Sequence, residues 1–107
     1  MKTLSESIIG RKNIISNFRK KDLQYGDIIV DRAGKVYIFD LTKFRTKTGW
    51  SGLGFYRDDL TSYSDTILDI MKVYRIQIDE TYKIDDDLLN KVKEIIPNIP
   101  PIWARKR

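Results

Sequence analysis

Histidine and cysteine are both absent from the 107 residues of this chain. Without histidine, the chain lacks the side chain that most often acts as a general base near neutral pH and as a neutral metal ligand. Without cysteine, thiol catalysis, disulfide bonds and thiolate zinc sites are excluded. The sequence also contains no phosphate-binding loop and no dinucleotide fingerprint. We therefore predict a protein that is not an enzyme and that uses no cofactor and no metal ion.

Long apolar runs are missing as well. No stretch approaches the roughly 18 apolar residues of a membrane-spanning helix, and no apolar signal-peptide segment occurs. We therefore expect no membrane partner and a cytoplasmic location in the cell that makes the protein. A length of 107 residues and a hydrophobic fraction of 41% indicate one folded domain over residues 1–107.

The acidic clusters are the remaining source of catalytic groups. Asp58-Asp59 and Asp85-Asp86-Asp87 match no calcium-binding loop, and the second cluster is explained as the start of a helix. A hydrolase that uses paired carboxylates is the enzymatic alternative, which we disfavour.

The stretch from Leu23 to Phe39 predicts a β-hairpin. Two short runs rich in β-branched and aromatic residues, Ile28–Val30 and Val36–Phe39, flank a turn that contains Gly34. A third run over 68–78 alternates apolar and polar residues, with Lys72 as the exception, and predicts a long strand with one inner side. The opposite side of this strand, which carries Arg75, is expected to be partly wet.

The fold class that we predict is α+β, with a small antiparallel, barrel-like sheet of three to five strands between two helical segments. Thr3 and Glu6 match a capping box, but Gly10 leaves open whether the first segment is one helix or two. Asp85 is the expected N-cap of an amphipathic helix that Pro97 ends. The predicted parts are a basic helical arm at 1–21, a β core at 22–78 with an aromatic loop at 49–60, the helix at 84–96, and a Pro/Trp/basic tail at 97–107.

The net charge of +5 comes from the two ends of the chain. The favoured interpretation of these cations is a solvated helix face, and the alternative is a phosphate-binding surface. Between the ends, Lys43, Arg45 and Lys47 alternate with other residues and would project from one face if this segment is a strand. The candidate nucleic-acid-binding residues are Arg11, Lys12, Arg19, Lys20, Lys21, Arg105, Lys106 and Arg107.

Aromatic residues gather in the loop at 49–60 and in the tail. In the loop, we favour a plug for the core over a platform that stacks nucleic-acid bases. The tail tryptophan either packs back onto the domain or belongs to an extended motif that waits for a partner. The candidate residues for binding another protein are Trp50, Phe55, Tyr56 and Trp103.

The hairpin sequence resembles a recurrent opening of small, uncharacterised phage and prophage proteins. In that group a Leu-x-x-Gly-Asp segment leads into a strand, an Arg-x-Gly turn and a second strand, as at Leu23–Ile38 here. Trp50, Tyr56 and Val73-Tyr74 are similar to the aromatic loop and closing strand of the group, so the resemblance covers residues 23–75. Ala33 stands where the group has Asn. The resemblance implies a phage or mobile-element origin and a small barrel-like sheet, and it implies no catalytic residues.

The function that these observations favour is that of a non-enzymatic phage or mobile-element accessory protein that binds another protein. Its partner would be a virion component or a host factor, such as a defence complex that the protein inhibits. The alternative is a nucleic-acid-binding protein that uses its two basic ends. A self-assembling homo-oligomeric subunit is a third interpretation. The expected location is the host cytoplasm, with the virion as a second location.

Overall fold

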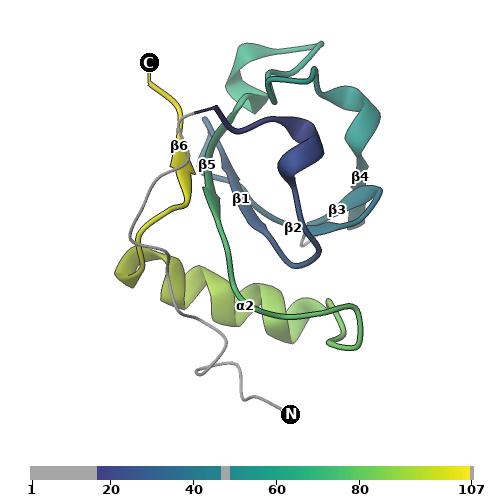
Figure 1. The fold of residues 1–107 in the computed structure, drawn as a ribbon, viewed down its shortest axis with the longest axis vertical. Helices are drawn as coiled ribbons and strands as arrows, with labels where there is room; N and C mark the ends of the chain where they lie inside the picture. The colour runs from purple at the N-terminus through teal and green to yellow at the C-terminus, as the bar shows by residue number, and fades with distance from the viewer. Residues whose placement is uncertain (1–16, 47–48, 107) are drawn as a thin grey trace.

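The computed structural model describes residues 17–46 and 49–106. Six strands form one antiparallel sheet in the order β4-β3-β2-β1-β5-β6 (Figure 1). The strands are β1 (Ile28–Asp31), β2 (Val36–Asp40), β3 (Lys43–Thr46), β4 (Gly49–Gly52), β5 (Ile70–Tyr74) and β6 (Trp103–Ala104). The α-helix is α2 (Asp86–Ile95), and the short 3-10 helices are η1 (Lys20–Asp22), η2 (Leu53–Phe55), η3 (Thr66–Leu68) and η4 (Ile96–Asn98).

The α+β class and the antiparallel sheet are confirmed, whereas the barrel and the count of three to five strands are wrong. The sheet has six strands and stays open, with β4 and β6 as its two edges. The additional strands come from segments expected to be irregular, since β4 lies in the predicted aromatic loop and β6 in the predicted tail. Both are held by pairing with a neighbouring strand, β3 or β5, and not by strong local strand propensity.

The predicted basic helical arm at 1–21 lies mostly outside the described residues. Where the chain is described, residue 17 is in a turn and η1 begins at Lys20, so the arm does not end as an α-helix. The phenyl ring of Phe18 is buried in the core, which anchors this segment across one face of the sheet (Figure 1).

The predicted hairpin at Leu23–Phe39 is confirmed. β1 and β2 pair with Ile28 opposite Ile38 and Val30 opposite Val36. Gly34 closes the turn with a φ of +85°, a left-handed conformation that a residue without a Cβ adopts at little cost.

The long strand predicted over 68–78 is shorter, because β5 spans Ile70–Tyr74. The pairing of β5 with β1 shifts register between Val30 and Asp31, so one extra residue bulges out of β5. The bulge places Ile70 on the same face as Val73, whereas Tyr74 packs on the other face, so the single inner side predicted for this run is wrong.

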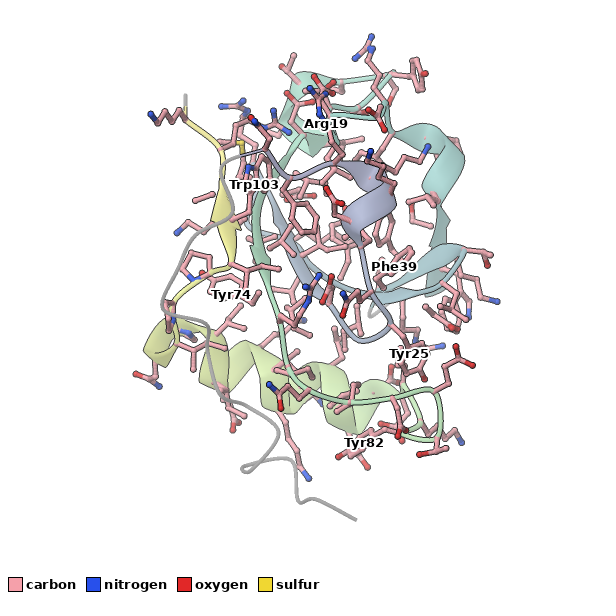
Figure 2. All side chains as sticks on the ribbon, in the orientation of Figure 1. Arg19, Tyr25, Phe39, Tyr74, Tyr82 and Trp103 are labelled. Atoms are coloured by element: carbon pink, nitrogen blue, oxygen red, sulfur yellow. The ribbon has the colours of Figure 1, made fainter. Side chains whose placement is uncertain are left out.

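The sheet is covered on both faces. One face and the segments around it enclose a cluster that includes Phe44, Tyr56 and Leu60, and the other face packs on α2 through Leu88 and Leu89. Figure 1 shows α2 beneath the curled sheet, and Figure 2 shows Tyr74 between β5 and this helix. The predicted helix is thus confirmed, and the side chain of Asp85 caps it by accepting from the amide of Leu88 at 3.0 Å.

A buried ion pair joins the start of the sheet to the end of β5. Arg75 was expected on a partly wet face, yet it is 8% exposed and donates from Nε and Nη2 to the two carboxylate oxygens of Asp27, both at 2.8 Å. Its Nη2 also donates to the carbonyl of Asp22 at 3.0 Å. The bidentate geometry is the strong form of a charge-assisted hydrogen bond, so this pair fixes the entry of the chain into β1.

Of the two interpretations of the tail, the structure selects packing onto the domain. β6 pairs with β5 at Trp103 opposite Val73, and the indole is 7% exposed and stacked on the ring of Phe18 at 6.0 Å. Figure 2 shows Trp103 pointing from β6 into the molecule. Trp103 and Ala104 therefore form a structural strand, in place of the alternative of an extended motif that waits for a partner.

Candidate functional site around the β3–β4 hairpin

The β3–β4 hairpin carries an exposed aromatic ring flanked by cations. Trp50 is 45% exposed and lies opposite Arg45 in the strand register, so the two side chains share one face of the sheet. The Nζ of Lys43 lies 4.3 Å from the centroid of the indole ring, and the guanidinium carbon of Arg45 lies 5.2 Å from it. Arg45 in turn pairs with Asp86 of α2 at 2.9 Å. We call Lys43, Arg45 and Trp50 the tryptophan face of the hairpin.

The opposite face of the same hairpin borders a cavity of about 360 Å³, which we call the seam cavity because it lies between β4 and the segment at 62–68. Its volume falls within the range of small-ligand pockets, near the lower end. Six hydroxyl side chains dominate the lining, together with three apolar side chains, one glycine and one lysine. The lining residues are Lys35, Tyr37, Thr46, Gly49, Trp50, Ser51, Phe55, Tyr56, Ser62, Ser64 and Leu68.

Two buried tyrosines and a carboxylate support the cavity from below. The hydroxyl of Tyr37 donates to the carboxylate of Asp31 at 2.8 Å, and the amide of Lys35 donates to the other oxygen of this carboxylate at 2.9 Å. Burial, followed by the hydrogen bond to Asp31, raises the pKa of Tyr37 above its usual range. Burial also raises the pKa of Tyr56. Both phenols therefore stay protonated at neutral pH and act as hydrogen-bonding groups, not as bases.

The serine wall of the cavity is held by a second buried carboxylate. Asp69 accepts from the amide of Ser62 at 2.8 Å and lies 3.7 Å from the guanidinium of Arg32. The hydroxyl oxygen of Ser62 accepts from the amide of Ser64 at 3.1 Å. These bonds fix the backbone of the wall.

Two of the four predicted protein-binding residues lie at the surface. Trp50 and Phe55 are exposed by 45% and 63%, and they lie within and directly after β4. Tyr56 and Trp103 are buried core residues, so Trp50 and Phe55 are the two whose rings are accessible to a partner. Tyr56 packs edge-on against Phe44 at 5.5 Å, which is the plug role that we favoured for this part of the loop.

Among the predicted nucleic-acid-binding cations that are described, Arg19, Lys20 and Arg105 all reach the segment at 56–59. Arg11, Lys12 and Arg107 lie outside the described residues. Three of the others contact the chain itself: Arg19 lies 3.8 Å from the carboxylate of Asp58, Lys20 donates to the carbonyl of Tyr56 at 2.8 Å, and Arg105 donates to the carbonyls of Ile70 and Asp59 at 2.9 and 2.6 Å. Lys21 and Lys106 are exposed.

Several residues of this site escaped the sequence interpretation. Lys35, Ser62 and Ser64 reach the seam cavity only because the curled sheet brings the β1–β2 turn and the segment at 62–68 toward β4. The hydroxyl-rich run at 61–64 is the signal that could have indicated a polar wall.

Metal and membrane sites are not indicated where the chain is described. Within residues 17–46 and 49–106, no three acidic side chains converge as metal ligands. None of the helices in these ranges is long and apolar enough to cross a membrane.

With the fold and site in view, we compared the chain with known proteins. No family model matches it. No curated protein and no solved structure matches it significantly either. The resemblance of residues 23–75 to small phage proteins therefore stays a prediction, and the function has to be argued from the geometry.

Proposed function

We propose that this chain is a non-enzymatic protein that acts by binding another protein, and that the β3–β4 hairpin is its docking surface. The observation that supports the proposal is the pair of exposed aromatic side chains, Trp50 on the hairpin and Phe55 directly after it, beside a strand whose Phe44 is anchored in the core. Tryptophan and arginine are the residue types most enriched among binding hot spots. A rigid support lowers the entropic cost of binding, because the partner meets a surface that is already ordered.

The hairpin is held rigidly. Phe44 of β3 is fully buried between the rings of Phe39 and Tyr56, each at 5.5 Å. Arg45 ties the opposite face of the strand to the start of α2. The exposed aromatic residues therefore project from a fixed frame.

A phage or mobile-element origin fits this proposal, because small non-enzymatic proteins of that kind act by docking. The partner would then be a virion component or a host factor, including a defence complex. The neighbourhood of the gene tests this origin: tail or capsid genes beside it favour a virion partner, and early genes favour a host partner.

The docking role is tested by affinity capture with the full chain as bait, from host lysate and from virions. We expect a specific partner that Trp50→Ala and Phe55→Ala each release, while the fold of each variant, measured by circular dichroism, is unchanged. Tyr63→Ala is the matched control, because Tyr63 is 64% exposed beneath the guanidinium of Arg57 at 4.7 Å but does not line the seam cavity. Capture that is equally strong with all three variants would refute the hairpin as the docking surface.

A nucleic-acid-binding role is the second candidate, supported by the cations that flank the indole of Trp50. Such a ring could stack a base while the cations contact phosphates. Binding of a single-stranded oligothymidine would then weaken steeply as salt rises. Fluorescence anisotropy at low and physiological salt measures this directly, and absence of binding at low salt removes the candidate.

A further inference from the structure

The two edges of the sheet differ in how they are protected. Edge strands expose unpaired backbone groups, and proteins usually shield them by shortness, charge, proline or a bulge. β6 has two residues, follows Pro100-Pro101, and is followed by Arg105, whose amide donates to the carbonyl of Met71 at 2.7 Å. This edge is therefore short and is flanked by two prolines and a charged residue.

The β4 edge is longer than the β6 edge and has less protection. Its four residues, Gly49 to Gly52, include no charge and no proline, and they pair with β3 residue by residue without a register shift. In the described part of the chain, β3 is the one strand that pairs with β4. The two glycines also leave the approach to the backbone unobstructed by side chains.

The space beside this edge is already hollow. The seam cavity borders Gly49, Trp50 and Ser51 along the strand, and the side chain of Phe55 bounds it at the end of β4. A strand laid along β4 would direct alternate side chains to its two faces. One set would meet the hydroxyl groups of the cavity, and the other set would meet the tryptophan face.

Each face carries a lysine that pairs with no acidic side chain of the described residues. Lys35 is the charged residue among those that line the cavity, and Lys43 contacts the indole of Trp50 on the other face. Neither lysine forms a salt bridge with a described residue. Acidic side chains of a bound strand would therefore meet a cation on either face, where complementary charge favours association.

We propose that the open edge of β4 binds an extended acidic segment of the partner as an added strand, with Lys35 and Lys43 contacting its carboxylates. This inference rests on the proposed docking function and names the chemistry of the partner. Main-chain hydrogen bonds to the edge supply affinity, and the alternating side chains supply specificity. A nucleic acid could use the indole and the lysines, but it has no peptide backbone to pair with the edge, so the open strand favours a peptide.

The probe for the test is a library of random decapeptides, selected for binding to the immobilised full chain. We expect the enriched peptides to be rich in Asp and Glu. The tightest peptide is then synthesised with a fluorescent label, both unmodified and with alternate backbone nitrogens methylated along one edge or the other. Methylation along the pairing edge should weaken binding by about tenfold or more, since each lost backbone hydrogen bond is worth roughly 0.5–1.5 kcal/mol.

Charge-reversal variants test the two lysines. Lys35→Glu and Lys43→Glu should each weaken binding of the acidic peptide by about fivefold, and the loss should shrink at high salt. Lys91→Glu is the control, because it makes the same charge change at an exposed position of α2, away from the edge. Equal effects of the three variants would show that only net charge matters and would overturn the assignment of these lysines.

Three further results would overturn the proposal. The first is a selection that enriches no acidic peptides, and the second is unchanged binding whichever edge of the peptide is methylated. The third is competition for the same site by an oligothymidine. These failures are distinguishable from failure of the docking function itself. If a captured partner is still released by Trp50→Ala but its binding segment is helical or basic, the docking function stands and the added-strand inference fails.

Discussion

Removing the Arg75 side chain should greatly lower the free energy of unfolding of this protein, because Arg75 and Asp27 form a buried ion pair. The side chains are exposed by 9% and 0%, and two hydrogen bonds of 2.8 Å join them. In Arg75→Met, the carboxylate of Asp27 stays in the core and loses both hydrogen bonds from the guanidinium. It keeps the hydrogen bond from the amide of Gln24 at 2.8 Å, which does not supply a compensating charge.

The magnitude follows from the burial of the pair. Breaking a buried ion pair on one side costs about 3–5 kcal/mol, whereas a small domain has roughly 5–15 kcal/mol of total stability. The variant also loses the bond from Arg75 to the carbonyl of Asp22. Arg75→Lys should fall between wild type and Arg75→Met, because lysine keeps the charge but cannot form the two parallel bonds.

Equilibrium unfolding in urea, followed by tryptophan fluorescence, measures these differences. A double-mutant cycle that adds Asp27→Asn isolates the pair, and we expect the double variant to be clearly more stable than the sum of the single effects predicts. A loss below about 1 kcal/mol for Arg75→Met, or effects that add within about 0.5 kcal/mol, would refute this account of the pair.

Three other perturbations test the core, a turn and the support of the cavity. Trp103→Ala should lower the free energy of unfolding by about 3–5 kcal/mol in urea titrations, because the ring is a core component and not a free tail motif. Gly26→Ala should cost more than Gly34→Ala: both residues have positive φ, but a Cβ at Gly26 would lie 2.4 Å from Cγ1 of Ile78, whereas none lies within 4 Å at Gly34. Tyr37→Phe should cost about 1–2 kcal/mol at neutral pH. The pKa of Tyr37 is raised in the folded state, so its contribution to stability is complete below the unfolded-state pKa of about 10 and is lost as pH rises above that value. Tyr37→Phe lacks this titration, so it should lose less stability than wild type in alkaline urea titrations.

Each of these expectations has an outcome that contradicts it. A Trp103→Ala protein as stable as wild type would mean that β6 contributes little to the fold. Equal losses for the two glycine variants would show that the neighbouring isoleucine moves away at no cost. A parallel alkaline decline of the Tyr37→Phe and wild-type proteins would mean that other tyrosines account for the pH dependence.

The exposed aromatic residues show where local sequence is a poor guide to a binding surface. Trp50, Phe55 and Tyr56 stand within a few residues of one another and are similar in type, so the sequence treats them alike. The pairing of β4 with β3 turns Trp50 outward, and η2 then directs Tyr56 into the core while Phe55 stays exposed. The pairing of β4 with β3 and the turn of η2 distinguish the three residues, and neither can be read from the residue types alone.

Local patterns alone determined the hairpin at 23–39 and the helix after Asp85, because both depend on neighbours in the chain: a glycine that accepts a left-handed turn, a capping carboxylate, and an apolar stripe at helical spacing. Tertiary structure decided the rest. It moved Arg75 from an expected surface position into a buried pair with a carboxylate 48 residues away, converted the tail into β6, and left β4 as an open edge beside a cavity. These outcomes depend on contacts between segments that are distant in sequence. Such contacts form only once the sheet has brought those segments together, and they then outweigh the local preferences of the residues.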